Sequence, residues 1–498
     1  MKKVLVIVLA LSTLNGFAQK TAKPDPYAKV ITPADLKKRL YIVASADMQG
    51  RETATAGQRK AAAYIESEFK SLGLQPGNNG NYQLFYNVYQ DSLTNAKLQV
   101  NGEDYQLDKD FNPSINNIPS TMRFSEVVFV GANAADSLKT ANLAGRAVLI
   151  VGGLPQRFGR GGPGASIYGT LIAKGVAAII SVGNNYPMAT PANRKGFQST
   201  SLFKRNITPQ LFTVSENVAK AIVGADYESA KSSTSLVKTY PADVLLDVEK
   251  TSLTAQSSDV IGVLPGTDLK DEYLVISAHY DHLGLRNGNI YYGADDDGSG
   301  TVSILQIAQA FAKAKAEGKG PRRSIVFLAN SGEEEGLWGS DYYTSHPTVP
   351  LDKTTADLNI DMIGRTDSSR KVGDSLNYVY VVGDDKLSTD LRTISEAANK
   401  KYVKMELDYK FNDPNDPNNI YFRSDHYNFA KHGVPIIFYY DGMLGADYHK
   451  PTDTPDKINY NLMAKRAQLV FYTAWEMANR NDMLKRDIAM PIPTRRGM

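Results

Sequence analysis

Histidine and carboxylate side chains gather between residues 273 and 300, at positions where they could bind metal ions. The apolar run YLVISA is typical of a buried strand, and His279 and Asp281 follow it directly. Three consecutive aspartates, residues 295–297, then precede a Gly-Ser-Gly turn and an apolar helical pattern. Because so much negative charge in one loop is unfavourable unless a cation offsets it, the stretch suggests a hydrolytic site with two metal ions.

Three other motifs follow predicted strands. SGEEEGLWGS places Glu333 and Glu334 where a strand gives way to a helix, so one carboxylate could bind a metal while the other acts as a general base. Asp361 interrupts an apolar strand, and His449 lies in a loop after the strand VPIIFYYD. Taken one at a time, the three motifs have simpler interpretations: an acidic helix start, a buried carboxylate and a surface histidine. Together with the first stretch, they predict convergence at the crevice where α/β sheets bind ligands.

Composition restricts the ligands and the partners. The 498-residue chain has no cysteine, so disulfides are excluded and a metal site must use imidazole and carboxylate groups. The formal net charge of +3 includes Lys2 and Lys3 and is only +1 without them. This balance gives no reason to expect nucleic acid or an anionic membrane as a partner.

The N-terminus has the pattern of a secretory signal peptide. A lysine pair precedes a short apolar run, residues 4–11, and small residues lead to a predicted cleavage near Ala18. The run is far shorter than the ~20 residues needed to cross a bilayer, and no other stretch of the sequence could span one. We therefore expect a periplasmic or secreted protein.

The pattern of strands and helices changes twice along the chain. From about Phe111 to Pro241, short strands and a glycine-rich loop (residues 159–164) predict an inserted domain. That loop lacks the Lys-Ser/Thr ending of a phosphate-binding loop. From Val260 onwards, strands and helices alternate, which predicts an α/β sheet.

Six segments carry a family resemblance: SAHYDHLG, GADDDGSG, SGEEEGLWGS, NIDMIG, RSDHYNFAKHGVP and YHKPTDTPDKI resemble, in order and spacing, the M28 family of di-zinc aminopeptidases. The resemblance implies an α/β fold, with a mixed central β-sheet flanked by helices on both faces. The insert resembles, more loosely, an α+β protease-associated (PA) domain. The expected organisation is a signal peptide (1–18), a peptidase domain in two parts (25–110 and 250–485), a PA-like insert (111–241) and a tail (486–498).

The resemblance also implies a set of metal ligands. One zinc ion would take His279 and Asp361, the other would take Glu334 and His449, and Asp296 would bridge them. The expected cofactor is therefore two zinc ions per chain.

Other residues receive roles by the same resemblance. Glu333 matches the family's general base, Asp281 matches the residue that orients the histidine ligand, and Tyr448 is similar to a tyrosine that steadies the oxyanion in some members. Four residues in family-like segments are expected to support the site or line a substrate pocket: His282, Ser424, Asp425 and His426. His346 and His432 are expected to be structural or on the surface.

The implied function is a zinc aminopeptidase acting on peptides with a free N-terminus. A glutaminyl cyclase shares the fold but works with one zinc ion. A carboxypeptidase-like member would need a basic pocket for the substrate carboxylate. A binding module without catalysis is a third alternative, although such proteins usually lose ligands and all five positions are filled here.

Overall fold

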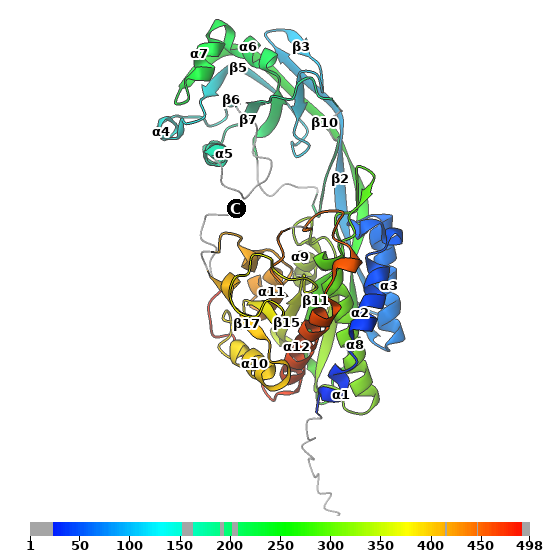
Figure 1. Cartoon of the computed structure of the whole chain (residues 1–498). Helices are drawn as coiled ribbons and strands as arrows, with labels where there is room; N and C mark the ends of the chain where they lie inside the picture. The colour runs from blue at the N-terminus through cyan, green and yellow to red at the C-terminus, as the bar shows by residue number, and fades with distance from the viewer. Residues whose placement is uncertain are drawn as a thin grey trace, which may run out of the picture.

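Two lobes joined by a pair of long strands make up the molecule (Figure 1). The computed structural model describes residues 23–151, 163–189, 194–201, 208–413, 416–445 and 447–490. The predicted signal peptide, most of the glycine-rich loop and most of the tail lie outside these residues. Strands β2 (Gln83–Val100) and β10 (Val237–Leu264) pair antiparallel, from Gln83 opposite Val260 to Val100 opposite Val244. Both extend from the larger lobe into the smaller one.

The larger lobe contains a mixed sheet. Four adjacent strands, in the order β18, β15, β11 and β14, run parallel. Their bounds are Ile436–Tyr440, Thr354–Ile360, Leu269–His279 and Arg323–Asn330. Strand β10 pairs antiparallel with β14 on one side, and β16 (Tyr378–Val382) pairs antiparallel with β18 on the other, followed by β17 (Glu406–Asp408). The carboxyl ends of the four parallel strands consequently lie along one edge.

Helices cover both faces of this sheet. Leu274 and Ile276 of β11 belong to one buried apolar cluster, whereas Val275 belongs to a cluster on the opposite face, as the alternation of side chains along a strand requires. The first face carries α2 (Pro33–Val43), α3 (Ala56–Ser71), α8 (Gly300–Ala316), α10 (Leu391–Ala398) and α12 (Tyr460–Asn479). The second carries α9 (Trp338–Ser345) and α11 (His426–Lys431). The predicted fold class is confirmed.

Local signals explain where helices begin. Helix α2 starts after Thr32, whose hydroxyl accepts a hydrogen bond from the Asp35 backbone N–H at 3.1 Å, with Pro33 at the first helical position. A hairpin at Asn101 joins β2 to β3 (Glu103–Tyr105), which returns along β2. Strand β2 runs continuously up to this turn.

The smaller lobe has a separate apolar core. Its strands are β4 (Phe111–Pro113), β5 (Ser120–Val130), β6 (Ala147–Val151), β7 (Ala178–Val182) and β9 (Gln210–Val214), with α6 (Glu216–Val223) packed against them. Strand β10 continues without a break through residues 241–250, so the lobes share strands there instead of meeting at a linker. The relation to a PA domain stays a prediction.

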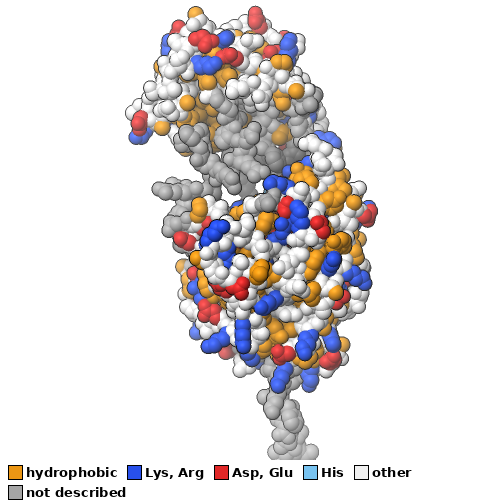
Figure 2. All heavy atoms as spheres, in the orientation of Figure 1, with side chains coloured by type: hydrophobic (Ala, Val, Ile, Leu, Met, Phe, Trp, Pro, Cys, Tyr) orange, Lys and Arg blue, Asp and Glu red, His pale blue; other side chains and the backbone are white. Residues whose placement is uncertain are grey.

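On the face drawn in Figure 2, basic and acidic side chains are intermingled over both lobes. Among the described helices, none combines the length and the apolar character needed to cross a bilayer.

Candidate metal centre

The predicted ligands meet at the carboxyl edge of the parallel strands. His279 is the last residue of β11, and Glu334 follows the end of β14. Asp361 follows the last residue of β15, so it lies at the strand end and does not interrupt the strand as the sequence suggested. Asp296 precedes α8 and His449 lies in the loop after β18. Segments far apart in sequence are thus brought to one place because parallel strands end at the same edge.

The distances among these side chains suit metal coordination. His279 Nε2 lies 3.3 Å from Asp296 Oδ1 and 3.6 Å from Asp361 Oδ1. His449 Nε2 lies 3.1 Å from Asp296 Oδ2 and 3.0 Å from Glu334 Oε2. Two ligand atoms at ~2.0–2.1 Å from a tetrahedral zinc ion are separated by about 3.3 Å. The two oxygens of Asp296 therefore face two different histidines at separations that fit zinc.

Two further residues come within ligand range. Donor atoms of His279, Asp297 and Asp361 lie within 4.8 Å of one another, and so do those of His282, Asp296 and Glu334. Asp297 Oδ1 accepts hydrogen bonds from the backbone N–H groups of Gly300 (2.8 Å) and Met362 (3.0 Å). Asp297 is therefore already engaged in joining the start of α8 to the end of β15.

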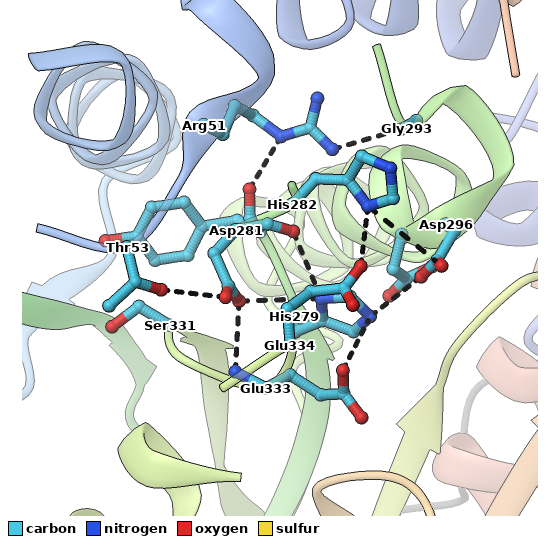
Figure 3. Close-up of polar contacts among 12 residues, drawn as sticks. Arg51, Thr53, His279, Asp281, His282, Gly293, Asp296, Ser331, Glu333 and Glu334 are labelled. Atoms are coloured by element: carbon cyan, nitrogen blue, oxygen red, sulfur yellow. Dashed lines mark hydrogen bonds and ion pairs between the residues drawn. The ribbon is translucent and has the colours of Figure 1, made fainter. Parts of the chain in front are cut away.

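Asp281 lies beside His279 (Figure 3). Its Oδ1 is 3.5 Å from His279 Nδ1, and the same oxygen accepts a hydrogen bond from the Glu333 backbone N–H at 3.2 Å. Its Oδ2 accepts a hydrogen bond from Thr53 Oγ1 at 2.8 Å. Asp281 thus links the histidine to the segment that carries Glu333 and Glu334.

The sequence gave no role to the loop that contains Thr53. Next to it, Arg51 is fully buried and donates hydrogen bonds to the carbonyl oxygens of Tyr280 (2.6 Å), Tyr292 (2.7 Å) and Gly293 (3.0 Å). Arg51 thus joins the end of the segment that carries His279 to the start of the segment that carries Asp296. The only sequence signal was the polar, glycine-containing character of MQGRETATAG.

His282 contacts a predicted ligand directly. Its Nδ1 lies 2.7 Å from Glu334 Oε1, and its side chain is fully buried. Since Oε2 of Glu334 faces His449, the carboxylate is held from both sides. The sequence assigned His282 only a general supporting role.

The adjacent glutamates have opposite electrostatic environments. Burial alone would raise the pKa of Glu334, but His282 and His449 outweigh it and lower the pKa to about 2. Burial raises the pKa of Glu333 well above its usual value, and the charges of Asp361 and Glu334 raise it further against the effect of His279. Such opposite shifts suit one carboxylate that stays charged as a ligand and another that exchanges a proton.

Tyr448 lies beside the metal-ligand cluster. Its ring stacks on that of His449, with ring centroids 3.8 Å apart, and its Oη accepts a hydrogen bond from Arg423 Nη2 at 3.0 Å. Burial raises the pKa of Tyr448 well above 10, so the hydroxyl keeps its proton. A role in steadying an oxyanion stays a prediction.

The remaining predicted residues do not join this cluster as ligands. Ser424 accepts a hydrogen bond from Asn359 Nδ2 at 2.9 Å, and the pKa of the buried Asp425 is raised by burial to about 7. His346 and His432 are exposed, and each ring Nδ1 lies near the carbonyl oxygen four residues earlier.

His426 is a buried histidine with a structural role. Its Nε2–H donates to the carbonyl of Tyr421 at 2.8 Å, and its ring stacks on Phe438 with centroids 4.7 Å apart. Burial lowers the pKa of His426 to about 3.

This environment predicts a pH-dependent stability. Between pH 6.5 and about 3 the unfolded chain binds a proton at His426 that the folded chain does not, so the free energy of unfolding should fall as the pH falls, by up to about 1.4 kcal/mol per pH unit. His426→Gln keeps a donor for Tyr421 but does not titrate. Urea unfolding of both proteins at pH 7, 6 and 5 should show a shallower decline for the variant; parallel declines would contradict the prediction.

Part of the chain is similar in sequence to known peptidases. A model of Peptidase family M28 matches residues 259–474. The sequence is 29% identical over 239 residues to a probable leucine aminopeptidase of Arthroderma otae, covering 47% of this chain and 61% of the relative. It is 30% identical over 235 residues to leucine aminopeptidase 1 of Sclerotinia sclerotiorum, covering 44% of this chain and 56% of the relative. The chain thus spans little more than half the length of these relatives.

Solved structures extend the likeness beyond this segment. An aminopeptidase from Aneurinibacillus sp. strain AM-1 matches with a TM-score of 0.58 and 18% identity, covering 94% of this chain and 99% of that one. BSAP, a zinc aminopeptidase from Bacillus subtilis, matches with a TM-score of 0.54 and 19% identity, covering 92% and 99%. At these identities the likeness shows a shared fold.

Proposed function

We propose that the protein is a zinc-dependent aminopeptidase of the M28 family, which removes residues from the N-terminus of peptides. The match of residues 259–474 to the model of that family supports the proposal. The observation that carries the proposal is the position of Asp296, whose two oxygens face His279 and His449 at 3.3 and 3.1 Å. The names of the relatives, leucine aminopeptidases, support the same activity.

Two zinc ions per chain would complete the site. His279 and Asp361 would hold one ion, Glu334 and His449 the other, and Asp296 both. Imidazole and carboxylate groups are accepted zinc ligands, and a chain without cysteine offers no thiolate alternative.

The mechanism divides the chemistry between the ions and the protein. When bound, zinc supplies a Lewis acid that lowers the pKa of water to about 7 and polarises a peptide carbonyl. Glu333, whose side chain is 13% exposed and whose Oε2 lies 3.9 Å from His279 Nε2, would take the proton of the attacking water and pass it to the leaving nitrogen. Asp281 would keep the His279 ring in place, and the Tyr448 hydroxyl would donate to the developing oxyanion.

Metal analysis combined with a substrate panel tests the proposal. We expect two zinc ions per chain and chelator-sensitive hydrolysis of aminoacyl anilides and of peptides with a free N-terminus. Cyclisation of an N-terminal glutamine with one zinc ion would indicate a glutaminyl cyclase instead. Cleavage of N-blocked peptides from the C-terminus would indicate a carboxypeptidase, and metal binding without turnover would indicate a binding module.

His282 should affect metal binding through Glu334. His282→Gln is expected to weaken the binding of one of the two zinc ions by about 10- to 100-fold, because Glu334 loses the contact that holds its second oxygen. His432→Gln, at an exposed histidine, is the control. Competition with a chromophoric chelator measures both, and equal affinities in the two variants would refute the role of His282.

The proposal also covers where the protein is located and what the smaller lobe does. The signal-like N-terminus supports a periplasmic or secreted protein cleaved near Ala18, which N-terminal sequencing of the exported chain would test. The insert, residues 111–241, would be a PA-like domain that shapes access to the site of the peptidase domain, residues 25–110 and 250–485.

A further inference from the structure

A basic side chain lies at the edge of this acidic site. Arg423 precedes α11, and its guanidinium contacts Tyr448, whose ring stacks on His449. The cation therefore lies next to a residue that packs on a proposed zinc ligand.

The guanidinium of Arg423 has N–H groups that are not used in the hydrogen bond to Tyr448. Within the described ranges, Tyr448 Oη is its hydrogen-bond partner and no carboxylate pairs with it. Other arginines of the same lobe are differently placed: Arg370 pairs with Asp408 and Glu406, and Arg365 pairs with Asp447. Arg423 is also exposed to solvent, so a ligand can reach it.

We infer that Arg423 binds the C-terminal carboxylate of the substrate, which makes dipeptides the preferred substrate class. This rests on the proposed aminopeptidase function. A guanidinium presents paired N–H groups that match a carboxylate, whereas the surrounding aspartates and glutamates would repel one. The carboxylate of a bound peptide is therefore expected at Arg423.

The length of the substrate follows from bond geometry. In a dipeptide, three bonds with a summed length of about 4.3 Å separate the carbon of the cleaved carbonyl from the carboxylate carbon. Arg423 Nη2 lies 3.0 Å from the Tyr448 hydroxyl that would contact the cleaved carbonyl oxygen. A guanidinium this close can reach the carboxylate of the residue directly after the cleaved bond. Each additional residue moves the carboxylate ~3.3–3.6 Å further away in an extended chain.

The test compares Leu-Gly with its C-terminal amide, which differs only in the carboxylate, and with Leu-Gly-Gly and leucine p-nitroanilide. For the zinc-loaded wild-type protein we expect kcat/KM for Leu-Gly to exceed that for the amide and for the tripeptide by roughly 10- to 100-fold. Arg423→Gln should bring the ratio of dipeptide to amide close to one. Arg423→Lys, which keeps the positive charge but not the paired N–H groups of the guanidinium, should give an intermediate ratio. Arg286→Gln, which removes an exposed cation from the hairpin of β12 (Leu285–Arg286) and β13 (Asn289–Ile290), should leave the ratio unchanged.

The outcomes separate this inference from the proposed function. If Arg423 acted only through Tyr448, Arg423→Gln would slow all four substrates alike with the ratio unchanged, which would overturn the inference while leaving an aminopeptidase. A dipeptide-to-amide ratio near one in the wild-type protein would also overturn the inference, and so would a change of that ratio in Arg286→Gln. A zinc-loaded wild-type protein that cleaves none of the substrates would refute the proposed function, and the inference with it. Equal zinc contents of the variants exclude a loss of the site, and Arg423→Lys still tests the ratio if Arg423→Gln does not fold.

Discussion

Glu333→Gln is expected to keep both zinc ions and to lower kcat by about 10²–10⁴-fold. The amide has nearly the shape of the carboxylate but cannot accept the proton of the attacking water. Glu333 is not a proposed metal ligand, and the nearest histidine nitrogen lies 3.9 Å from its carboxylate. Metal content should therefore not change, while turnover collapses.

Glu335→Gln is the matched control, since it makes the same chemical change two residues away. The pKa of Glu335 is also raised, by burial, to about 7, so the control shares an unusual proton affinity with Glu333. Stopped assays of anilide hydrolysis on samples of known zinc content would compare the two. Substantial turnover by zinc-loaded Glu333→Gln would remove Glu333 from the role of general base.

Asp296→Asn is expected to abolish the binding of both ions and, with it, hydrolysis. The carboxylate faces both histidines, so its loss weakens two sites through one substitution. Binding of an ion to the folded chain alone adds ~4 kcal/mol to the free energy of unfolding at a free concentration of 1,000 Kd. Zinc should accordingly raise the melting temperature of the wild-type protein, and a chelator should reverse the effect.

Asp296→Asn should show no rise of the melting temperature on addition of zinc. Asp456→Asn, at an exposed position of the short helix Pro455–Lys457, removes the same charge outside the site and should respond as the wild type does. Differential scanning calorimetry with and without zinc makes the comparison. A zinc-dependent rise of the melting temperature in Asp296→Asn, as large as in the wild type, would rule out a bridging aspartate.

The convergence of the proposed ligands could be predicted from the sequence because most of them lie in short motifs next to predicted strands. His279 ends one strand with a clear apolar pattern, Glu334 and Asp361 follow two others, and parallel strands end at one edge. The helix starts were equally local, since a capping hydroxyl and a proline are adjacent to the helix that they begin.

The surroundings of the ligands could not be predicted in the same way. Thr53 contacts Asp281 across 228 positions of sequence, and Arg51 reaches carbonyl groups more than 200 positions away. Every residue has a backbone carbonyl group, so the residue types in a sequence do not indicate which carbonyl a side chain will contact. The continuity of β2 and β10 could not be predicted for a related reason, because it depends on pairing between segments that the smaller lobe separates.

The pairing of β2 with β10 makes the second lobe topologically independent of the metal centre. The chain leaves the larger lobe along one strand and comes back along its immediate neighbour, with Asn95 opposite Glu249. The residues between these two points form, in topological terms, an enlarged hairpin turn. Replacing them by a tight turn would not change the order of any strand that carries a proposed ligand.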